Sequence, residues 1–410
     1  MFVKYGEQEN IGSNCTTVKN TNQLLIIDEL RTNGSLSRSD LAKRLHLSNP
    51  SISKNVEDLK NRGILIETGP AITDLGRRPV MLRFNENCGC VIAISFTNQD
   101  GAYVCLSNLD GRFFETVNVP GEHVFDEKLK GGVLEAIRRL LSKYSAVCGK
   151  LMCICIACPG IIDPYDGHII YALQIPDSAN IDFNEIFGKE FGVPVVVKND
   201  VNLAASGEHS FGAGKGCTEM LYVYINQGIA GGIILRNELY EGVSGYSGEI
   251  GLIKTEIRET SSYTDEQYFR STKFDVTSAI IIEKIAERFD AGEPTVLRDM
   301  VSSSSEITLE HVNEAVKQGD RLCCSLIGYS ARVLASLLLT INQILDLELF
   351  VLAGTVELFG DFYINAIKQH FASSPLGSNV DVTFSKLGDM ASVYGGVNKA
   401  IEVALENLVE

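Results

Sequence analysis

Apolar strands followed by turns with glycine or polar residues recur along most of this chain, and no other feature limits the fold as strongly. The main ones are CVIAISF (90–96), AYVCLSN (102–108), FFETVNVP (113–120), LMCICIACPG (151–160), PVVVKND (194–200), LYVYINQG (221–228) and LFVLAGTV (349–356). Several are apolar along their whole length, which is typical of strands buried on both faces of a sheet. The amphipathic segment EKLKGGVLEAIRRLLSKY (127–144) predicts a helix. We therefore expect an α/β body with mixed sheets, in which the strand pattern runs twice.

Length and charge limit the class of protein. A chain of 410 residues predicts two or three domains, and its net charge of −16 argues against general polyanion binding by the whole molecule. No uninterrupted apolar run reaches about 18 residues, so we expect no membrane span. The first 20 residues lack the apolar core of a signal peptide, which indicates a cytoplasmic protein.

The 11 cysteines are scattered, and no pair of CxxC units is present. Cys153, Cys155 and Cys158 fall in a predicted buried strand, where cysteine acts as a small hydrophobic residue. We therefore expect reduced structural thiols and no metal site.

Residues 19–84 differ from the body, because they hold more Lys and Arg than Asp and Glu. The apolar period of NQLLIIDELRTN (22–33) predicts a helix that stops at Gly34. Ser37, with Asp40 three residues later, fits a capping box that starts a second helix.

A third helix is predicted from NPSISKNVEDLKNRG (49–63), with Asn49 as its cap and Pro50 at its first helical position. Gly63 ends it. A tight turn around Leu47 joins the second and third helices, so the pair predicts a helix-turn-helix.

ILIET (64–68) and VMLRFN (80–85) predict two strands around a loop, which is the arrangement of a wing. A generic three-helix domain is the alternative. The order of three helices and a hairpin, with basic residues on the third helix and in the wing, favours DNA binding in the major groove. The candidate DNA contacts, expected to be exposed, are Arg38, Ser51, Ser53, Lys54, Asn55, Arg77 and Arg78.

Four body motifs occur in an order and spacing that resembles the ROK family of sugar-responsive repressors, sugar kinases and their relatives. They are ACPGIID (157–163), KNDVNLAASGE (198–208), GVSGYSGEIG (242–251) and VLAGTV (351–356). The resemblance covers the whole chain, because a winged helix precedes the body in the family's repressor branch. It implies an α/β fold with an N-terminal winged helix-turn-helix and an actin-like (ribonuclease H-like) two-lobed sugar-kinase body.

This resemblance also implies a division of the chain. We expect an N-terminal extension (1–18), the winged helix-turn-helix (19–84), lobe 1 (85–200), lobe 2 (201–390) and a C-terminal helix that packs back on lobe 1 (391–410).

Matching motifs imply the residues that bind a sugar. Asn199 and Asp200 match the pair that contacts sugar hydroxyls, and in the family's kinases the Asp is the catalytic base. Capping of the following helix is the alternative role of Asp200. Glu249 matches a sugar-binding glutamate, and Gln174 and Glu266 fall near positions of further sugar contacts.

Two phosphate motifs depart from the family pattern. Ser95 stands where the family has an acidic residue, and Thr97 stands where it has glycine. In NQGIAGG, Gln227 and Ala230 replace a threonine and a glycine. We therefore expect no catalytic residues, no cofactor and no kinase activity.

A zinc site that the family usually carries cannot form here. Leu252 stands in the position of its histidine, and residues 252–271 contain no Cys or His. The sequence thus predicts no metal.

A sugar-responsive transcriptional repressor is the function most consistent with these features. Its expected partners are a double-stranded DNA operator, a sugar or sugar-phosphate effector, and further copies of itself as a homodimer or dimer of dimers. A sugar kinase with a fused DNA-binding head and a DNA-binding protein with a non-functional sugar site remain as alternatives.

Overall fold

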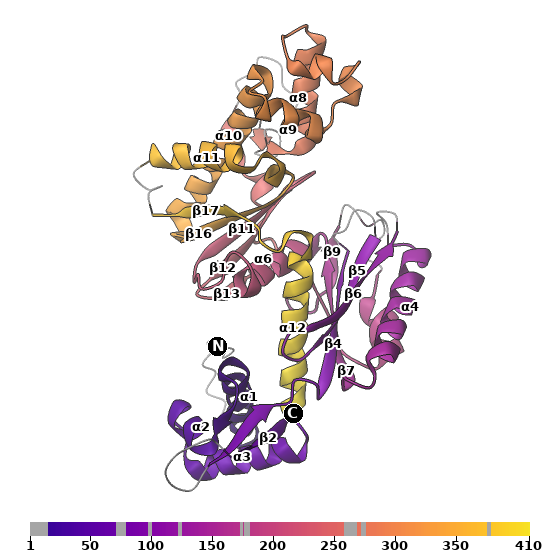
Figure 1. The fold of residues 1–410 in the computed structure, drawn as a ribbon, viewed down its shortest axis with the longest axis vertical. Helices are drawn as coiled ribbons and strands as arrows, with labels where there is room; N and C mark the ends of the chain where they lie inside the picture. Colours follow the sequence, from indigo (N-terminus) through magenta and orange to yellow (C-terminus); the bar gives the residue numbers. More distant parts are fainter. Residues whose placement is uncertain are drawn as a thin grey trace.

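The computed structural model describes residues 15–70, 79–96, 101–121, 125–172, 175, 181–257, 269–271, 276–374 and 379–410. A small N-terminal unit lies at one end of an elongated molecule, and two larger lobes make up the rest (Figure 1). Gln174, Glu266, Arg77, Arg78 and Thr97, which the sequence singles out, lie outside the described residues.

The N-terminal unit is a winged helix. Its elements are α1 (Cys15–Asn33), β1 (Leu36–Ser37), α2 (Arg38–Arg44), α3 (Asn49–Asn61), β2 (Leu65–Pro70) and β3 (Val80–Phe84). The three strands pair in the order β1-β3-β2. The predicted capping box of Ser37 and Asp40 is confirmed at the start of α2. The predicted cap of α3 is wrong by one residue, because the hydroxyl of Ser48, rather than Asn49, accepts the Ser51 N–H.

The two lobes repeat one sheet topology, as the strand pattern predicts. The strands of lobe 1 are β4 (Gly89–Ser95), β5 (Gly101–Asn108), β6 (Phe113–Pro120), β7 (Lys150–Cys158) and β10 (Val195–Asn199). Those of lobe 2 are β11 (Met220–Ile225), β12 (Ile229–Leu235), β13 (Glu238–Tyr240), β16 (Leu349–Gly354) and β17 (Asp381–Phe384). The sheet orders are β10-β7-β4-β5-β6 and β13-β12-β11-β16-β17. In each sheet, three consecutive strands form an antiparallel meander. The first strand of this meander also pairs in parallel with a strand that comes later in the chain, and that strand pairs in parallel with a second later strand.

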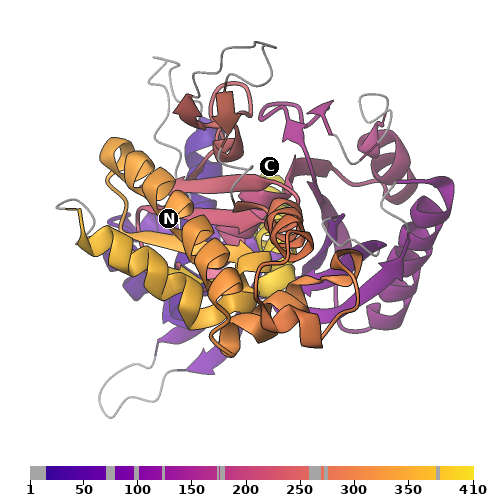
Figure 2. The ribbon, with the colours of Figure 1, turned by 90° about the horizontal axis from the view of Figure 1, so that it is seen from above.

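Helices cover both sheets (Figure 2). The α-helices of the body are α4 (Glu127–Tyr144), α5 (Lys189–Phe191), α6 (Asp200–Phe211), α8 (Ser278–Asp290), α9 (Leu309–Lys317), α10 (Arg321–Leu345), α11 (Gly360–Ala372) and α12 (Ala391–Val409). Short strands and turns complete it: β8 (Ile161–Ile162), β9 (Ile169–Tyr171), η2 (Asn184–Gly188), η3 (Ile250–Leu252), β14 (Lys254–Ile257), β15 (Phe269–Ser271), η5 (Val296–Asp299), η6 (Ser304–Glu306), η7 (Thr355–Phe359) and η8 (Gly388–Met390).

Helix α10 is the one helix of the described chain that is long and apolar enough to cross a membrane. Counting uninterrupted apolar residues misses it, because Arg332 and several small polar residues interrupt its sequence. In the fold it packs against α8, α9 and α11, and its apolar residues belong to the core of lobe 2. Burial in this core accounts for its composition.

Helix α12 connects all three parts of the molecule. It packs against α6 and against β4 and β7 of lobe 1, and it also contacts α1 of the winged helix (Figure 1). Near its C-terminus, the Arg62 guanidinium of the winged helix donates to the carbonyl of Leu408. Arg31 of α1 lies near lobe 1, with 3.8 Å between its Nε and Oδ1 of Asp110.

Candidate functional site

A cavity of about 550 Å³ lies where the two lobes meet. Tyr103 of β5 in lobe 1 forms part of its wall, and the start of α6, the strand β11, the turn after β16 and the start of α12 form the rest. Of the predicted sugar contacts that the structure describes, Asp200 lines this cavity, whereas Asn199 and Glu249 do not. Asp200, Tyr222, Tyr224, Glu357, Asp389 and Ser392 supply most of its polar side chains. A volume of this size falls within the range of small-molecule sites.

Asp200 is the first residue of α6, and it is 8% exposed on the cavity wall. Its Oδ1 accepts the N–H of Val201 at 2.9 Å. Burial, with a smaller contribution from the charge of Glu249, raises the pKa of the Asp200 carboxyl to about 7. This carboxyl can therefore exchange a proton near neutral pH.

Asn199 is the N-cap of α6, so the capping role considered for Asp200 is wrong. Its Oδ1 accepts the Asn202 N–H at 2.9 Å, and its Nδ2 donates to the Gly160 carbonyl at 2.8 Å. The amide keeps one N–H and one acceptor lone pair for a ligand.

Gly248 fixes the backbone directly before Glu249. Its φ of 91° is a left-handed conformation, and a Cβ there would lie 1.8 Å from the carbonyl oxygen of Gly231. Glu249 is half-buried, and this burial raises the pKa of its carboxyl. The charge of Glu249 also raises the pKa of Asp200, so the two predicted carboxylates interact electrostatically.

Lys198 is a residue of this region that the sequence does not single out. Its Nζ donates to both carboxylate oxygens of Glu241, at 2.8 and 3.0 Å, and to the carbonyl of Pro164 at 3.1 Å. The two side chains are only 11% and 23% exposed. Lys198 therefore joins β10, the β8–β9 hairpin and the segment that leads to Glu249. A lysine directly before the Asn-Asp pair is the only signal in the sequence.

One altered position of the phosphate motifs, Ser95, has a structural role. Ser95 is fully buried, and its hydroxyl bonds the hydroxyl of Ser392 at 2.9 Å, which ties β4 to the start of α12. Gln227 lies exposed in the β11–β12 turn. Gly232 permits close packing on α6, because a Cβ there would lie 2.4 Å from Cβ of Ala205.

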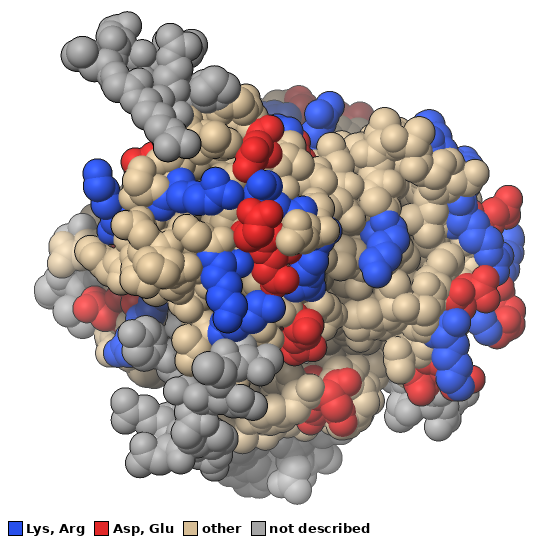
Figure 3. All heavy atoms as spheres, turned by 90° about the horizontal axis from the view of Figure 1, so that it is seen from below, with Lys and Arg blue, Asp and Glu red and all other residues tan. Residues whose placement is uncertain are grey.

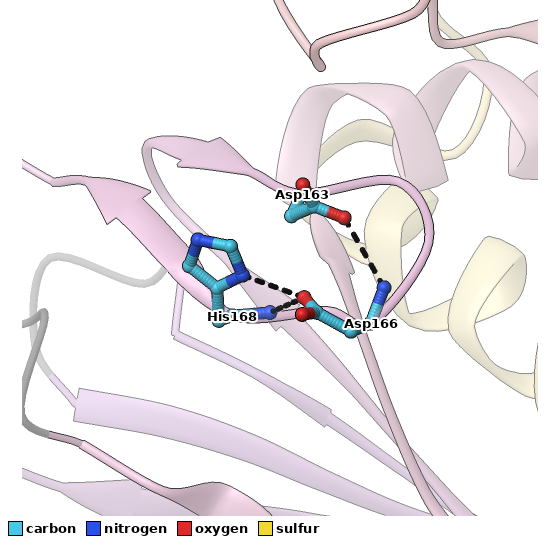
Figure 4. Close-up of side chains that lie close together, drawn as sticks. All are labelled: Asp163, Asp166 and His168. Atoms are coloured by element: carbon cyan, nitrogen blue, oxygen red, sulfur yellow. Dashed lines mark hydrogen bonds and ion pairs between the residues drawn. The ribbon is translucent and has the colours of Figure 1, made fainter.

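Within the described residues, one group of three possible metal ligands lies together: Asp163, Asp166 and His168, exposed or half-buried in the β8–β9 hairpin (Figure 4). Oδ1 of Asp163 accepts the N–H groups of Tyr165 and Asp166, and Oδ1 of Asp166 lies 2.6 Å from Nδ1 of His168. These bonds close the hairpin turn and account for the cluster without a metal. Leu252, at the position of the family's histidine, is 61% exposed.

The face of the winged helix carries Lys and Arg side chains with Asp and Glu between them (Figure 3). Ser53 and Lys54 are exposed on α3, and Ser51 is half-buried. The expectation that Asn55 is exposed is wrong. It is 5% exposed, because it faces the core of the unit and donates to the Ser51 carbonyl at 3.0 Å. Arg38 lies between two carboxylates, 3.6 Å from Glu57 and 3.7 Å from Glu67.

Known proteins resemble this chain over nearly its whole length. It is 25% identical to the xylose repressor of Caldicellulosiruptor bescii over 406 residues, which cover 95% of this chain and 97% of that protein. It is 24% identical to the DNA-binding transcriptional dual regulator NagC of Escherichia coli, with 99% of each chain covered. A crystal structure of a ROK family transcriptional regulator, a homolog of the Escherichia coli MLC protein, has the same fold, with a TM-score of 0.80, 21% identity and coverage of 96% of this chain and 98% of that one.

Two family matches divide the chain as the fold does. Residues 19–66 match the winged helix-turn-helix DNA-binding family. Residues 99–402, which include lobe 1 from β5 onward, lobe 2 and most of α12, match the ROK family. The chain therefore belongs to the ROK family.

Proposed function

We propose that this protein is a transcriptional repressor whose affinity for its DNA operator is controlled by a sugar or sugar phosphate bound between the lobes. The observation that carries the proposal is that one helix, α12, lines the cavity and also contacts the winged helix. Its first residues, Ala391 and Ser392, line the cavity, and its C-terminal half packs on the winged helix. Relatives named as xylose repressors and NagC support the same role.

The sugar contacts of the proposal are Asn199, Asp200 and Glu249. A buried carboxylate suits a sugar, because each sugar hydroxyl can donate a hydrogen bond to it. Gln174 and Glu266 are proposed as further contacts on the family resemblance alone. On the DNA side, Ser51, Ser53 and Lys54 of α3 would face the major groove, and Arg38, Arg77 and Arg78 would contact phosphates. Asn55 is left out because it is buried.

The proposal includes no phosphoryl transfer. A kinase of this family needs an acidic group near Mg²⁺ and open glycines at the phosphates. Here Ser95 is bonded to Ser392, and the cavity wall includes the carboxylates of Glu357 and Asp389. Negative side chains at this position repel a triphosphate.

The remaining parts of the proposal concern assembly and location. A repressor of this kind acts as a homodimer, or a dimer of dimers, on a palindromic operator in the cytoplasm. Two winged helices would then bind half-sites about one helical turn, or a small multiple, apart. We propose no cofactor.

The test combines three assays on the purified full-length protein. Footprinting on DNA upstream of carbohydrate genes should locate a palindromic site. Calorimetry against a sugar panel should find a ligand that alters binding to that site, and ATP consumption with this sugar should stay at background. Sugar-dependent ATP turnover that Asp200→Asn abolishes would instead establish the kinase alternative.

A further inference from the structure

We propose that the cavity between the lobes selects an uncharged ligand, so that the effector is a free sugar and not a sugar phosphate. This inference rests on the proposed function and narrows its ligand class. It follows from three features of the cavity: the charge of its wall, the occupancy of three backbone N–H groups beside it and a tyrosine hydroxyl on its wall.

The charged side chains of the cavity wall are all acidic. Asp200, Glu357 and Asp389 line it, and no Lys, Arg or His is among the described residues that do. Proteins recognise phosphate groups mainly through such cations. The negative charge of a phosphate ester would therefore lie beside carboxylates that are already partly dehydrated, and would be repelled by them.

The cation next to the site in sequence has no donor left for a ligand. All three donors of the Lys198 ammonium are used, by the two oxygens of Glu241 and by the Pro164 carbonyl. Glu241 also neutralises its charge at a distance of 2.8 Å. Lys198 thus positions this part of the fold and does not offer a phosphate site.

Backbone N–H groups at helix starts are the other common phosphate ligands. Side chains of the same chain already occupy three of them at α6 and after β16, whereas the start of α12 has no side-chain cap. At the start of α6, Asp200 accepts the Val201 N–H and Asn199 accepts the Asn202 N–H, each at 2.9 Å. After β16, Oε1 of Glu357 accepts the Gly354 N–H, also at 2.9 Å. Two of the three acceptors are carboxylates.

The same wall is well suited to hydroxyl groups. Ionised carboxylates only accept hydrogen bonds, and sugar hydroxyls can supply the donors. Tyr222, which is 2% exposed, lines the cavity, and its hydroxyl can both donate and accept a hydrogen bond. A ligand hydroxyl that bonds it contributes affinity. Burial also raises the pKa of Glu357, which is the expected response of a carboxylate that already lacks water.

The test is calorimetry of the full-length protein with matched pairs of ligands at pH 8. Xylose, glucose and N-acetylglucosamine would each be compared with a phosphate monoester of the same sugar. We expect at least one free sugar to bind and its ester to bind more weakly by on the order of a hundredfold, because like charges repel strongly in a partly dehydrated site. An ester that binds as tightly as the free sugar, or more tightly, overturns the inference.

A charge variant identifies the source of the selectivity. Asp389→Asn removes one exposed carboxylate of the cavity wall, so the preference for free sugar over ester should fall by about threefold to tenfold. Asp299→Asn is the matched control, because Asp299 is exposed and does not line the cavity. An unchanged preference in Asp389→Asn overturns the electrostatic account. If neither the free sugar nor its phosphate ester binds in any of the three pairs, the proposed function is overturned, and this inference with it.

Discussion

Asp200 is the residue whose chemistry the proposed effector site uses most directly. Its pKa of about 7 means that the carboxyl changes its charge near neutral pH. The folded protein holds this proton more tightly than the unfolded chain does. The contribution of Asp200 to folding stability is therefore greatest at acidic pH and is lost as pH rises through 7.

Sugar binding should depend on pH in the opposite direction. Ligand hydroxyls that donate to Asp200 favour its ionised form, so binding lowers its pKa and releases a proton. Affinity should rise by about tenfold between pH 6 and pH 8, because the ionised fraction of a group with a pKa near 7 rises by about that factor. Calorimetry in two buffers of different ionisation enthalpy measures the released proton.

Two substitutions check this assignment. Asp200→Asn should weaken binding by roughly tenfold to a hundredfold and remove the pH dependence, since a charged hydrogen bond contributes about 1.5–3 kcal/mol. Glu249→Gln removes a negative charge that raises the Asp200 pKa, so the midpoint should move to lower pH. A pH dependence that survives in Asp200→Asn would assign it to another group.

Lys54 is the clearest candidate phosphate contact of the DNA-binding face, because it is exposed on α3 and forms no ion pair with any described residue. Lys54→Ala should weaken operator binding and lower the slope of log affinity against log salt concentration by about one unit. Lys128→Ala is a matched control, since it removes an exposed lysine from α4 of lobe 1. Equal slopes for the two variants would remove Lys54 from the interface.

The predictability of single residues depends on where their partners lie. Asp200 and Glu249 stand out in the sequence because motifs within a few residues identify them, and their role as sugar contacts stays a prediction. The burial of Asn55 could not be predicted, because the apolar period of a short helix does not show whether a polar residue next to the apolar face is buried or exposed. The Lys198–Glu241 contact joins residues 43 positions apart in the chain, and no local pattern reveals it.

At the scale of elements, the Lys198–Glu241 ion pair fixes β10 to two irregular segments that surround the site. Lys198→Met should lower the free energy of unfolding by roughly 1.5–3 kcal/mol, since it leaves the carboxylate of Glu241 partly buried without its partner. It should also speed amide hydrogen exchange in the β8–β9 hairpin and in residues 241–249. Lys198→Arg should restore most of the protection.

Lys189→Met provides the comparison for this prediction. Lys189 pairs with Glu185, and the two side chains are 68% and 60% exposed. Loss of such a surface pair should change stability by less than about 1 kcal/mol. Should Lys198→Met and Glu241→Gln have additive effects in a double-mutant cycle, the pair would not be coupled.

The long helices and strands could be predicted from the sequence, whereas the short ones could not. The strands β4 and β7 and the helix α4 have apolar patterns that extend over several turns or strand repeats, and α4 spans the predicted residues 127–144. The β8–β9 hairpin has strands of two and three residues, which are too short for a readable period. The start of α3 was displaced by one residue because Ser48 and Asn49 can both cap a helix.

For the whole molecule, α12 is the element that can couple the two sites. The helix has 19 residues, and about 24 Å separate Ser392 at the cavity from Leu408, which contacts the winged helix. A change in the angle between the lobes that moves α12 would also move the DNA-reading helix α3 relative to its copy in a dimer. No sequence pattern predicts this connection, because it depends on how three separately folded parts pack.

Thermodynamic linkage provides the most direct test of the central claim that sugar and operator binding are coupled. Operator affinity would be measured with and without saturating sugar, and sugar affinity with and without saturating operator, in the same buffer and salt. The account predicts that both affinities change, in the same direction and by the same factor, of roughly 5-fold to 150-fold. A sugar that binds in the cavity while operator affinity stays unchanged would contradict it.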